Sequence, residues 1–198
     1  MTTTPIIAVT GATGHLGHLT LQALLKRGVP AGNLVALVRD PAKAADLAAQ
    51  GIQVRRADYR QPDTLSAALN GVNRLLLVSS NDFDDRVGQH RNVIEAARDA
   101  GVDLIAYTSL LNADRSAMIL AGDHQATEAI LRESGVPFTL LRNGWYTENY
   151  DLKGAVGSGA ILGAAGSHAL NPAPRQDYAR SEEHTSELQS PYVISYAV

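Results

Sequence analysis

Residues 5–17 read PIIAVTGATGHLG and join a short apolar run to a glycine-rich turn. The apolar run, 5–10, is rich in β-branched residues and predicts a buried strand. The turn spaces Gly11, Gly14 and Gly17 as G-x-x-G-x-x-G, and an Ala/Leu-rich helix follows it to about Arg27. Glycines let a backbone approach a pyrophosphate, and the start of a helix supplies free N–H groups and a partial positive charge. The stretch therefore predicts a dinucleotide-binding turn, with a ligand-free glycine turn as the alternative.

Strand and helix patterns alternate through the residues that follow this turn. Apolar strands are expected at 34–39, 52–58, 74–80, 103–109 and 137–142, and helices at 41–50, 62–71, about 87–101 and 121–134. This alternation is typical of βαβ units, and nearly continuous apolar strands indicate a sheet covered on both faces. We therefore expect an α/β fold, a Rossmann doubly wound parallel sheet with six strands in the order 3-2-1-4-5-6.

Composition excludes several classes of protein. The chain has 198 residues, 45 % of them hydrophobic and 19 % charged, a net charge of −3 and no cysteine. It therefore has no disulfide, no catalytic thiolate and no Cys-ligated zinc, and no basic surplus that would attract nucleic acid. No apolar stretch approaches the roughly 18 residues that span a bilayer, and the first residues do not resemble a signal peptide. We expect a cytoplasmic domain with no metal site and no nucleic-acid or membrane partner.

The composition changes at Arg180, from which the chain reads RSEEHTSELQSPYVISYAV. This segment resembles the translation of a sequencing-library adapter, in two fixed blocks at 180–190 and 194–198. Its polar composition continues neither the helix nor the strand pattern of the preceding residues. We expect 180–198 to be a non-native tail and the gene to continue beyond Ala179; a genuine polar tail is the alternative.

Polar residues follow the expected strands at their carboxyl ends, where ligands of doubly wound sheets bind. Arg39 ends the second strand, where an acid binds the ribose 2′-hydroxyl of NAD and an arginine suits the 2′-phosphate of NADP. We favour NADPH, although Asp40 follows directly and leaves NADH as an alternative. The other candidates at strand ends are Asp58 and Tyr59 near the adenine, and Ser79, Ser80 and Asn81 near the ribose and nicotinamide.

Six blocks carry a resemblance to a known family. They are GATGHLG (11–17), LVRDPAK (37–43), ADY (57–59), HRNVIEAARDAGV (90–102), YTSLL (107–111) and LRNGWYTENY (141–150). Together they resemble the NmrA-like branch of the atypical short-chain dehydrogenases, and within it the bacterial zinc-independent NADPH:quinone oxidoreductases. Members of this family are longer and add a C-terminal substrate lobe. The resemblance implies a NAD(P)-binding Rossmann domain at 1–150 and the start of the substrate lobe at 151–179, with most of that lobe missing.

The resemblance also implies which residues contact the cofactor. Beside the strand-end candidates above, these are Gly11, Ala12, Thr13, Gly14, His15, Leu16 and Gly17 in the turn, and Asn143, Gly144, Trp145, Tyr146, Thr147 and Glu148 after the sixth strand. Asn143 is also a candidate catalytic residue beside the nicotinamide. The alternative for Trp145 and Tyr146 is that their rings only pack beneath the cleft.

The resemblance implies hydride transfer from the nicotinamide to a small quinone. The Tyr-x-x-x-Lys pair of typical short-chain dehydrogenases is missing, and His124 and Glu128 hold that spacing instead. A quinone tolerates this loss because its oxygen takes a proton from water or a weak acid, and the cofactor carries the difficult chemistry. His124 is our candidate for that acid, and a histidine that only bonds backbone is the alternative. Ser109 stands where a catalytic serine usually does, but alone it relays no proton.

Two further functions compete with the reductase. Some NmrA-like proteins bind the dinucleotide as redox sensors without turnover, and the missing pair is compatible with that role. Lignan reductase-like chemistry requires a lysine that the fifth expected helix lacks. We also expect a homodimer. A chain without the substrate lobe is expected to bind substrate weakly and to expose an apolar surface that promotes association.

Overall fold

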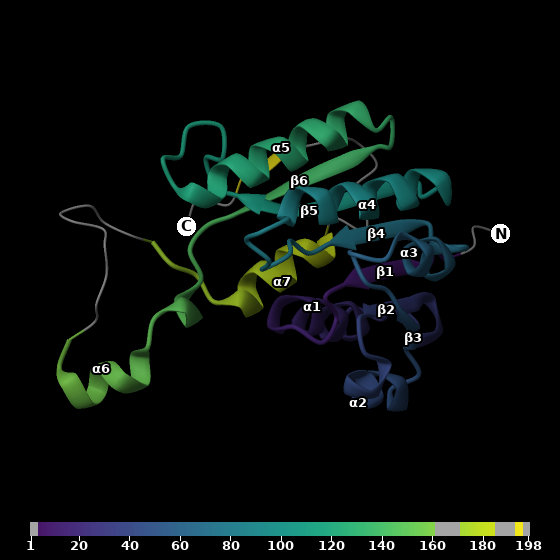
Figure 1. Ribbon diagram of the computed structural model, residues 1–198. Coiled ribbons are helices and arrows are strands. Elements are labelled where there is room, and N and C mark those ends of the chain that lie inside the picture. Colours follow the sequence, from purple (N-terminus) through teal and green to yellow (C-terminus); the bar gives the residue numbers. More distant parts are fainter. Residues whose placement is uncertain (1–3, 161–170, 185–192, 196–198) are drawn as a thin grey trace.

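A computed structural model describes residues 4–160, 171–184 and 193–195 of the chain. Its strands form one parallel sheet in the order β3-β2-β1-β4-β5-β6-β7 (Figure 1). The first six strands have the predicted order, so the Rossmann prediction is confirmed. Their bounds are β1 Ile7–Thr10, β2 Leu34–Val38, β3 Gln53–Arg56, β4 Arg74–Leu77, β5 Leu104–Leu110, β6 Phe138–Asn143 and β7 Val193–Ser195.

Helices cover both faces of this sheet (Figure 1). One face carries α1 (His15–Lys26), α2 (Ala45–Ala49) and α7 (Arg175–His184), and the other carries α3 (Pro62–Leu69), α4 (Arg86–Asp99) and α5 (Ile119–Glu133). A further helix, α6 (Leu152–Ser158), stands away from the body in Figure 1. Three short 3₁₀ helices, η1 (Ala31–Asn33), η2 (Pro41–Ala44) and η3 (Thr147–Asn149), complete the described elements.

The two covered faces explain why the central strands are apolar throughout. Successive side chains of a strand point to opposite faces. In β1, Ile7 and Val9 pack with Leu21 of α1, whereas Ala8 packs on the other face with Val93 of α4. All four residues of β1 and all five of β2 are buried. Thr10 shares the α4 face with Ala8 by the same alternation, which places a hydroxyl group at the end of β1 beneath the ligand edge.

The structure refines several predicted bounds. The helix predicted at 41–50 is a 3₁₀ turn followed by the short α2, because the Asp40 carboxylate accepts the Ala42 N–H at 3.1 Å and caps the 3₁₀ turn. The region after β6, for which the sequence predicts no helix, contains η3 and α6. Part of that region, 161–170, lies outside the described residues.

The segment from Arg180 has more regular structure than the sequence predicts. The helix α7 crosses the expected boundary at Ala179, and β7 pairs in parallel with β6. Tyr178 and Ala179 are buried against Leu16 of α1, so this part of α7 belongs to the fold. Within 180–198 the structure thus describes the end of a helix at 180–184 and a short strand at 193–195. Its adapter origin stays a prediction, and 185–192 and 196–198 lie outside the described residues.

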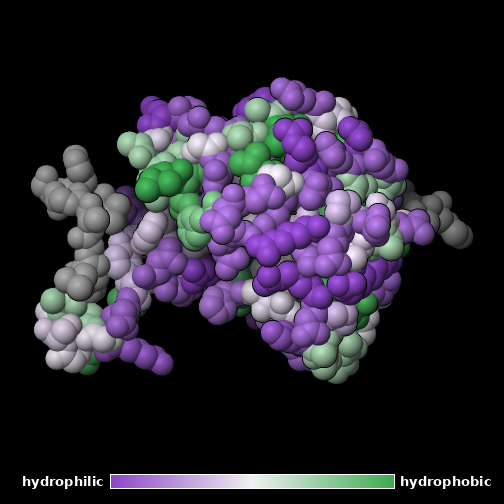
Figure 2. Space-filling view, in the orientation of Figure 1, coloured by the Kyte–Doolittle hydropathy of each residue, from purple (hydrophilic) through white to green (hydrophobic). Residues whose placement is uncertain are grey.

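Large apolar side chains are exposed at the start of α5. Ile119 is 96 % exposed and Met118 precedes it at 41 %. Figure 2 shows hydrophobic surface gathered at this end of α5, whereas the remaining surface in that view is mostly hydrophilic. The predicted tendency to associate through exposed apolar surface stays a prediction. In the described part of the chain, no helix is long and apolar enough to cross a membrane.

Candidate dinucleotide site

The glycine turn between β1 and α1 has the geometry for which glycine is required. Gly11 adopts φ +58°, a conformation that side chains disfavour, and its carbonyl accepts the Gly14 N–H at 2.8 Å. A Cβ added to Gly17 would lie 2.6 Å from the Gly11 carbonyl oxygen, closer than real Cβ atoms come. These three glycines therefore let α1 start directly against the end of β1. The N–H groups of a first helical turn have no acceptor within the helix, so they are available to an anion.

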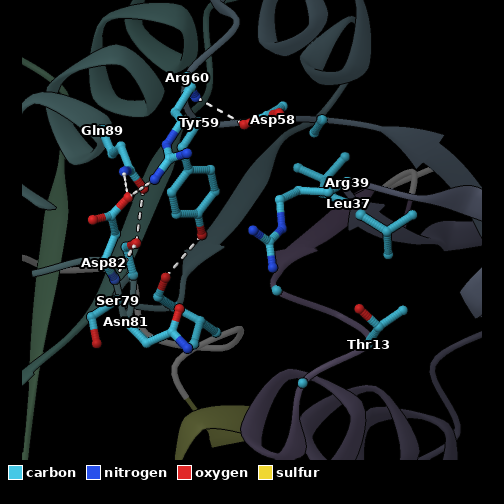
Figure 3. Close-up of a pocket in the computed structure, with 16 residues that line it drawn as sticks. Thr13, Leu37, Arg39, Asp58, Tyr59, Arg60, Ser79, Asn81, Asp82 and Gln89 are labelled. Carbon is cyan, nitrogen blue, oxygen red and sulfur yellow. Dashed lines mark hydrogen bonds and ion pairs between the residues drawn. The ribbon is translucent and has the colours of Figure 1, made fainter. Parts of the chain in front are cut away.

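A cleft of about 340 Å³ opens beside this turn at the carboxyl edge of the sheet (Figure 3). The cleft lies between the ends of β1 and β4, where the strand order reverses, and this is the position at which doubly wound sheets bind ligands. The predicted residues that line it are Gly11, Thr13, Gly14, Arg39, Asp58, Tyr59, Ser79, Ser80 and Asn81. The structure thus brings together the predicted residues from the ends of four strands.

Arg39 and Asp40 take different directions at the end of β2. Arg39 lines the cleft, and in Figure 3 its guanidinium points into the open space between Tyr59 and Thr13. Asp40 is absent from the cleft lining because its carboxylate caps η2. Asp40, the acid for which the sequence analysis kept NADH as an alternative cofactor, therefore has a structural role in the fold.

Tyr59 forms part of the cleft wall rather than presenting a free hydroxyl group. Its hydroxyl oxygen lies 2.5 Å from Thr10 Oγ1 and 2.8 Å from the Val78 carbonyl oxygen, and so joins the ends of β1 and β4. Burial raises the pKa of the Tyr59 phenol well above its usual value. The group therefore stays protonated and serves as a hydrogen-bond donor at the base of the cleft.

Three residues at the mouth of the cleft were missed by the sequence analysis. Arg60 forms an ion pair with Asp82, and Gln89 donates from Nε2 to Asp82 Oδ2 at 2.6 Å (Figure 3). The hydrogen bond from Arg60, followed by those from the Asp84 backbone and Gln89, lowers the pKa of Asp82 to about 2. The pair links the loop after β3 to the loop after β4. Their positions just beyond two strand ends were the signal that could have found Arg60 and Asp82.

A second cavity of about 430 Å³ lies on the other side of the glycine turn. Thr13 and Gly14 border both cavities, and the second is completed by His15, His18, Leu19, Glu148 and Arg175. This brings the predicted Glu148 to the glycine turn. Ala12 and Leu16 are buried, so these turn residues can offer only their backbone to a ligand.

The rest of the predicted segment after β6 packs against α7 and the residues just before it. Gly144 donates its N–H to the Tyr178 hydroxyl at 3.1 Å, and Thr147 donates to the Ala173 carbonyl at 3.0 Å. Asn143 is buried and donates from Nδ2 to the Tyr146 hydroxyl at 3.1 Å. Asn143, Gly144, Trp145, Tyr146 and Thr147 line neither cavity, so their contacts with a cofactor stay predictions.

His124 lies within α5, in the interior beneath β5 and away from the cleft lining. Its Nδ1 lies 2.7 Å from the Tyr107 hydroxyl, and the residue is 6 % exposed. Burial and the nearby Arg86 lower the pKa of His124 to about 4, so the ring is neutral at pH 7. It bonds a side chain rather than backbone, and this position gives no support to a role as proton donor.

Ser109 is also turned away from the cleft. Its hydroxyl group donates to Glu128 Oε1 of α5 at 2.7 Å. The side chain therefore lies on the α5 face of β5, where it helps to hold a buried carboxylate. Within the described residues, no group of three or more His, Cys, Asp or Glu side chains is arranged to hold a metal ion.

The glycine turn, the parallel sheet and the cleft at its switch point define a dinucleotide-binding Rossmann domain. Residues 11–181 match the NAD(P)H-binding family, and the chain belongs to that family. The resemblance carried by the six sequence blocks is thereby confirmed at the level of the family. The match runs across the expected domain boundary at residue 150.

The chain is also similar to individual proteins of known name. The chain is 54 % identical over 176 residues to quinone oxidoreductase 2 of Escherichia coli (strain K12), an overlap that covers 88 % of this chain and 61 % of that protein. It thus spans about three fifths of that relative. The crystal structure of the E. coli NADPH-dependent quinone oxidoreductase QOR2 with NADPH superimposes with a TM-score of 0.91 and 50 % identity, over 96 % of this chain and 69 % of that one. The crystal structure of Citrobacter sp. triphenylmethane reductase with NADP(H) superimposes with a TM-score of 0.91 and 41 % sequence identity, over 96 % of this chain and 69 % of that one.

Proposed function

We propose that this chain is the cofactor-binding part of an NADPH-dependent quinone oxidoreductase. The observation that carries the proposal is Arg39 in a cleft beside the glycine turn, in a chain 54 % identical to a quinone oxidoreductase over 88 % of its length. The QOR2 structure named above contains NADPH, which supports the same cofactor here.

The residues of the cleft fit NADPH better than NADH. A guanidinium matches the 2′-phosphate of NADPH through paired hydrogen bonds, whereas NADH needs a carboxylate at this strand end to bind its 2′-hydroxyl. The chain places Arg39 in the cleft and commits Asp40 to the cap of η2. The pyrophosphate fits the first turn of α1, whose free N–H groups point to the cleft side because Gly14 and Gly17 let this turn lie directly against the end of β1.

The bound cofactor supplies a hydride, and a quinone that gains one hydride and one proton becomes a hydroquinone. The residues of this chain bind and orient the cofactor through the glycine turn, Arg39 and the rigid end of β4. A quinone oxygen can be protonated by water, so the reaction does not depend on the buried His124. Catalytic roles for His124 and Asn143, a homodimer and a cytoplasmic location stay predictions.

A redox sensor that binds NADPH without turnover is the second candidate. The observation that favours it concerns Ser109, which stands where a catalytic serine usually does. Its hydroxyl group is bonded to Glu128 instead of facing the cleft, so it offers no hydrogen bond to a substrate there. The triphenylmethane reductase named above acts on a different conjugated acceptor, which supports a reductase with a broad choice of acceptors over a sensor.

Absorbance at 340 nm tests the proposal directly. The chain is mixed with NADPH and a simple benzoquinone, and the rate is compared with that of NADH and with that of Arg39→Ala. Quinone-dependent oxidation of NADPH that is faster than that of NADH is the expected result. Tight NADPH binding without turnover, in this chain and in a version extended by the remaining length of the relatives, would replace the reductase with the sensor.

A further inference from the structure

The end of β4 is held by side chains where the sheet ladder stops. The strand β4 ends at Leu77, and the next three residues carry N–H groups that are each bonded to a side chain from another element. Val78 donates to Thr10 Oγ1 of β1 at 2.9 Å, and Ser79 donates to Thr108 Oγ1 of β5 at 2.8 Å. Ser80 donates to His90 Nε2 of α4 at 2.9 Å. The backbone that faces the cleft is therefore fixed from three sides.

Ser80 is held most completely, because one face of α4 contacts every polar group that it has. Arg86 donates from Nε to the Ser80 carbonyl at 2.7 Å, and the Ser80 hydroxyl donates to Gln89 Oε1 at 2.8 Å. Arg86, Gln89 and His90 are spaced i, i+3 and i+4, so they share one helix face. All three are buried. A buried polar group costs free energy unless it is hydrogen-bonded, and here each of the three side chains has Ser80 as a partner.

The hydrogen bonds fix which nitrogen of His90 carries the proton. A backbone N–H only donates, so Nε2 of His90 must be the unprotonated acceptor for Ser80. Nδ1 then carries the proton and lies 2.9 Å from Thr127 Oγ1. The Thr127 hydroxyl donates its own proton to the Asp123 carbonyl at 2.8 Å, so it accepts from His90. Burial, with His124 and Arg86 nearby, lowers the pKa of His90 to about 3, in agreement with a neutral ring.

The same helix reaches the opposite loop of the cleft. Asn92 donates from Nδ2 to the Tyr59 carbonyl at 2.8 Å, in the loop after β3. Tyr59 and Ser80 both line the cleft, whereas His90 and Asn92 do not. His90 and Asn92 therefore set the position of both loops from behind the sheet without touching the ligand space, which Gln89 of the same helix does border.

We propose that His90 is a positioning residue for the dinucleotide, acting as a neutral Nδ1–H tautomer that holds the Ser80 amide and so fixes the 79–81 turn against the bound cofactor. The proposal rests on the proposed function, because it takes NADPH to be the ligand of this cleft. It assigns His90 to cofactor affinity rather than to proton transfer, since its ring is separated from the cleft by the turn that it holds.

The test compares two substitutions at this position in the full chain. His90→Leu has similar volume and leaves the Ser80 N–H without an acceptor, whereas His90→Gln restores a carbonyl oxygen at about the position of Nε2. We expect His90→Leu to weaken NADPH binding by about tenfold, the scale of one unsatisfied buried amide, and His90→Gln to recover most of that loss. Titration calorimetry measures the affinity, and thermal unfolding of each variant measures the stability separately.

Leu131→Ala is the matched control, because it opens a cavity in α5 without contacting the turn. It is expected to lower the unfolding temperature and to leave NADPH affinity unchanged. Equal losses of affinity in Leu131→Ala and His90→Leu, or no rescue by His90→Gln, overturn the proposal and leave His90 a purely structural residue.

Amide hydrogen exchange at Ser80 separates this proposal from the proposed function. His90→Leu is expected to speed exchange at Ser80 in the absence of any cofactor, and the imidazole ¹⁵N shifts of the unsubstituted chain are expected to show a protonated Nδ1. Unchanged exchange at Ser80 overturns the positioning role even if NADPH binds. An unsubstituted chain that fails to bind NADPH overturns the proposed function and the cofactor role of His90 with it.

Discussion

The buried Glu128 of α5 and the nearly buried Arg142 of β6 form an ion pair with two parallel hydrogen bonds. Arg142 Nε lies 3.0 Å from Glu128 Oε1, and Arg142 Nη2 lies 2.7 Å from Glu128 Oε2. Ser109 of β5 donates to the same carboxylate, so two strands and a helix meet at one residue. Arg142 directly precedes Asn143 and Gly144, and the pair therefore holds the end of β6 at the ligand edge of the sheet.

Glu128→Gln is expected to destabilise the fold by about 2–3 kcal/mol. Loss of the carboxylate charge leaves the nearly buried Arg142 with only the exposed Asp114 as a charged partner, and breaking a buried pair is costly. Urea unfolding measures the change. Arg132→Ala is the control, because Arg132 contacts the same carboxylate from an exposed position and such pairs contribute less than about 1 kcal/mol. Equal effects in the two variants would contradict a special role for the buried pair.

The stability contribution of Glu128 is also expected to depend on pH. Burial raises the pKa of this carboxyl group, but hydrogen bonds from Arg142 and Ser109 outweigh burial and hold the pKa below its usual value. A lowered pKa in the folded state means that the contribution is complete above the unfolded value of about 4.3 and is lost as pH falls through the folded value. The difference in unfolding free energy between the unsubstituted chain and Glu128→Gln should stay constant from about pH 6 to 8 and shrink below about pH 4. A difference that grows on acidification would exclude this explanation.

Gly17→Ala is expected to reduce both stability and NADPH affinity. The added Cβ would lie 2.6 Å from the Gly11 carbonyl oxygen and 2.9 Å from that of Thr10, so α1 must move away from β1 and carry its N-terminus out of line with the cleft. Gly122→Ala in α5 is the control, since no atom lies within 4 Å of its added Cβ and alanine favours a helix by about 1 kcal/mol. Thermal unfolding and calorimetric titration should show losses for Gly17→Ala only. A Gly17→Ala chain that binds NADPH normally would show that the turn is not the pyrophosphate site.

Arg39→Asp is expected to reverse the choice of cofactor. The substitution removes the cation that suits a 2′-phosphate and places a carboxylate where NAD-binding domains hold the ribose 2′-hydroxyl. NADPH affinity should fall by at least about tenfold, on the scale of a lost hydrogen-bonded charge pair, while NADH affinity is unchanged or improved. Dissociation constants for the two dinucleotides measure the ratio. The exposed Arg98→Asp, far along α4, should leave that ratio unchanged.

The sequence predicted the parts of this site that depend on the order of elements along the chain. The glycine turn, Arg39 and the 79–81 turn could be placed because each follows an apolar strand, and strand ends meet at one edge of a parallel sheet. The direction of side chains within an element was harder to predict. Ser109 and Thr108 are adjacent, yet Ser109 bonds Glu128 on the α5 face and Thr108 holds the Ser79 amide of the cleft wall.

His124 shows the same limit more sharply. Its spacing from Glu128 matches a catalytic pair, but the register of α5 on the sheet turns both side chains into the interior. Arg60 and Asp82 were missed for a different reason. They belong to separate βα loops, and only the folded sheet brings the two loops together across the mouth of the cleft. Their positions beyond strand ends place both residues at the ligand edge, but the contact between the two loops leaves no periodic signal in the sequence.

Asp82→Asn is expected to speed the release of NADPH without changing the unfolding temperature. The ion pair with Arg60 is exposed on the arginine side, and such pairs add little to stability, but this one joins the two loops that face each other across the cleft. Because the pKa of Asp82 is about 2, the carboxylate stays charged from pH 5 to 9, and the release rate should not change with pH through this group. Stopped-flow displacement of NADPH measures the rate, with Arg98→Ala as a control for loss of a surface ion pair elsewhere. Identical release rates for Asp82→Asn and the unsubstituted chain would mean that the mouth of the cleft is not restrained by this pair.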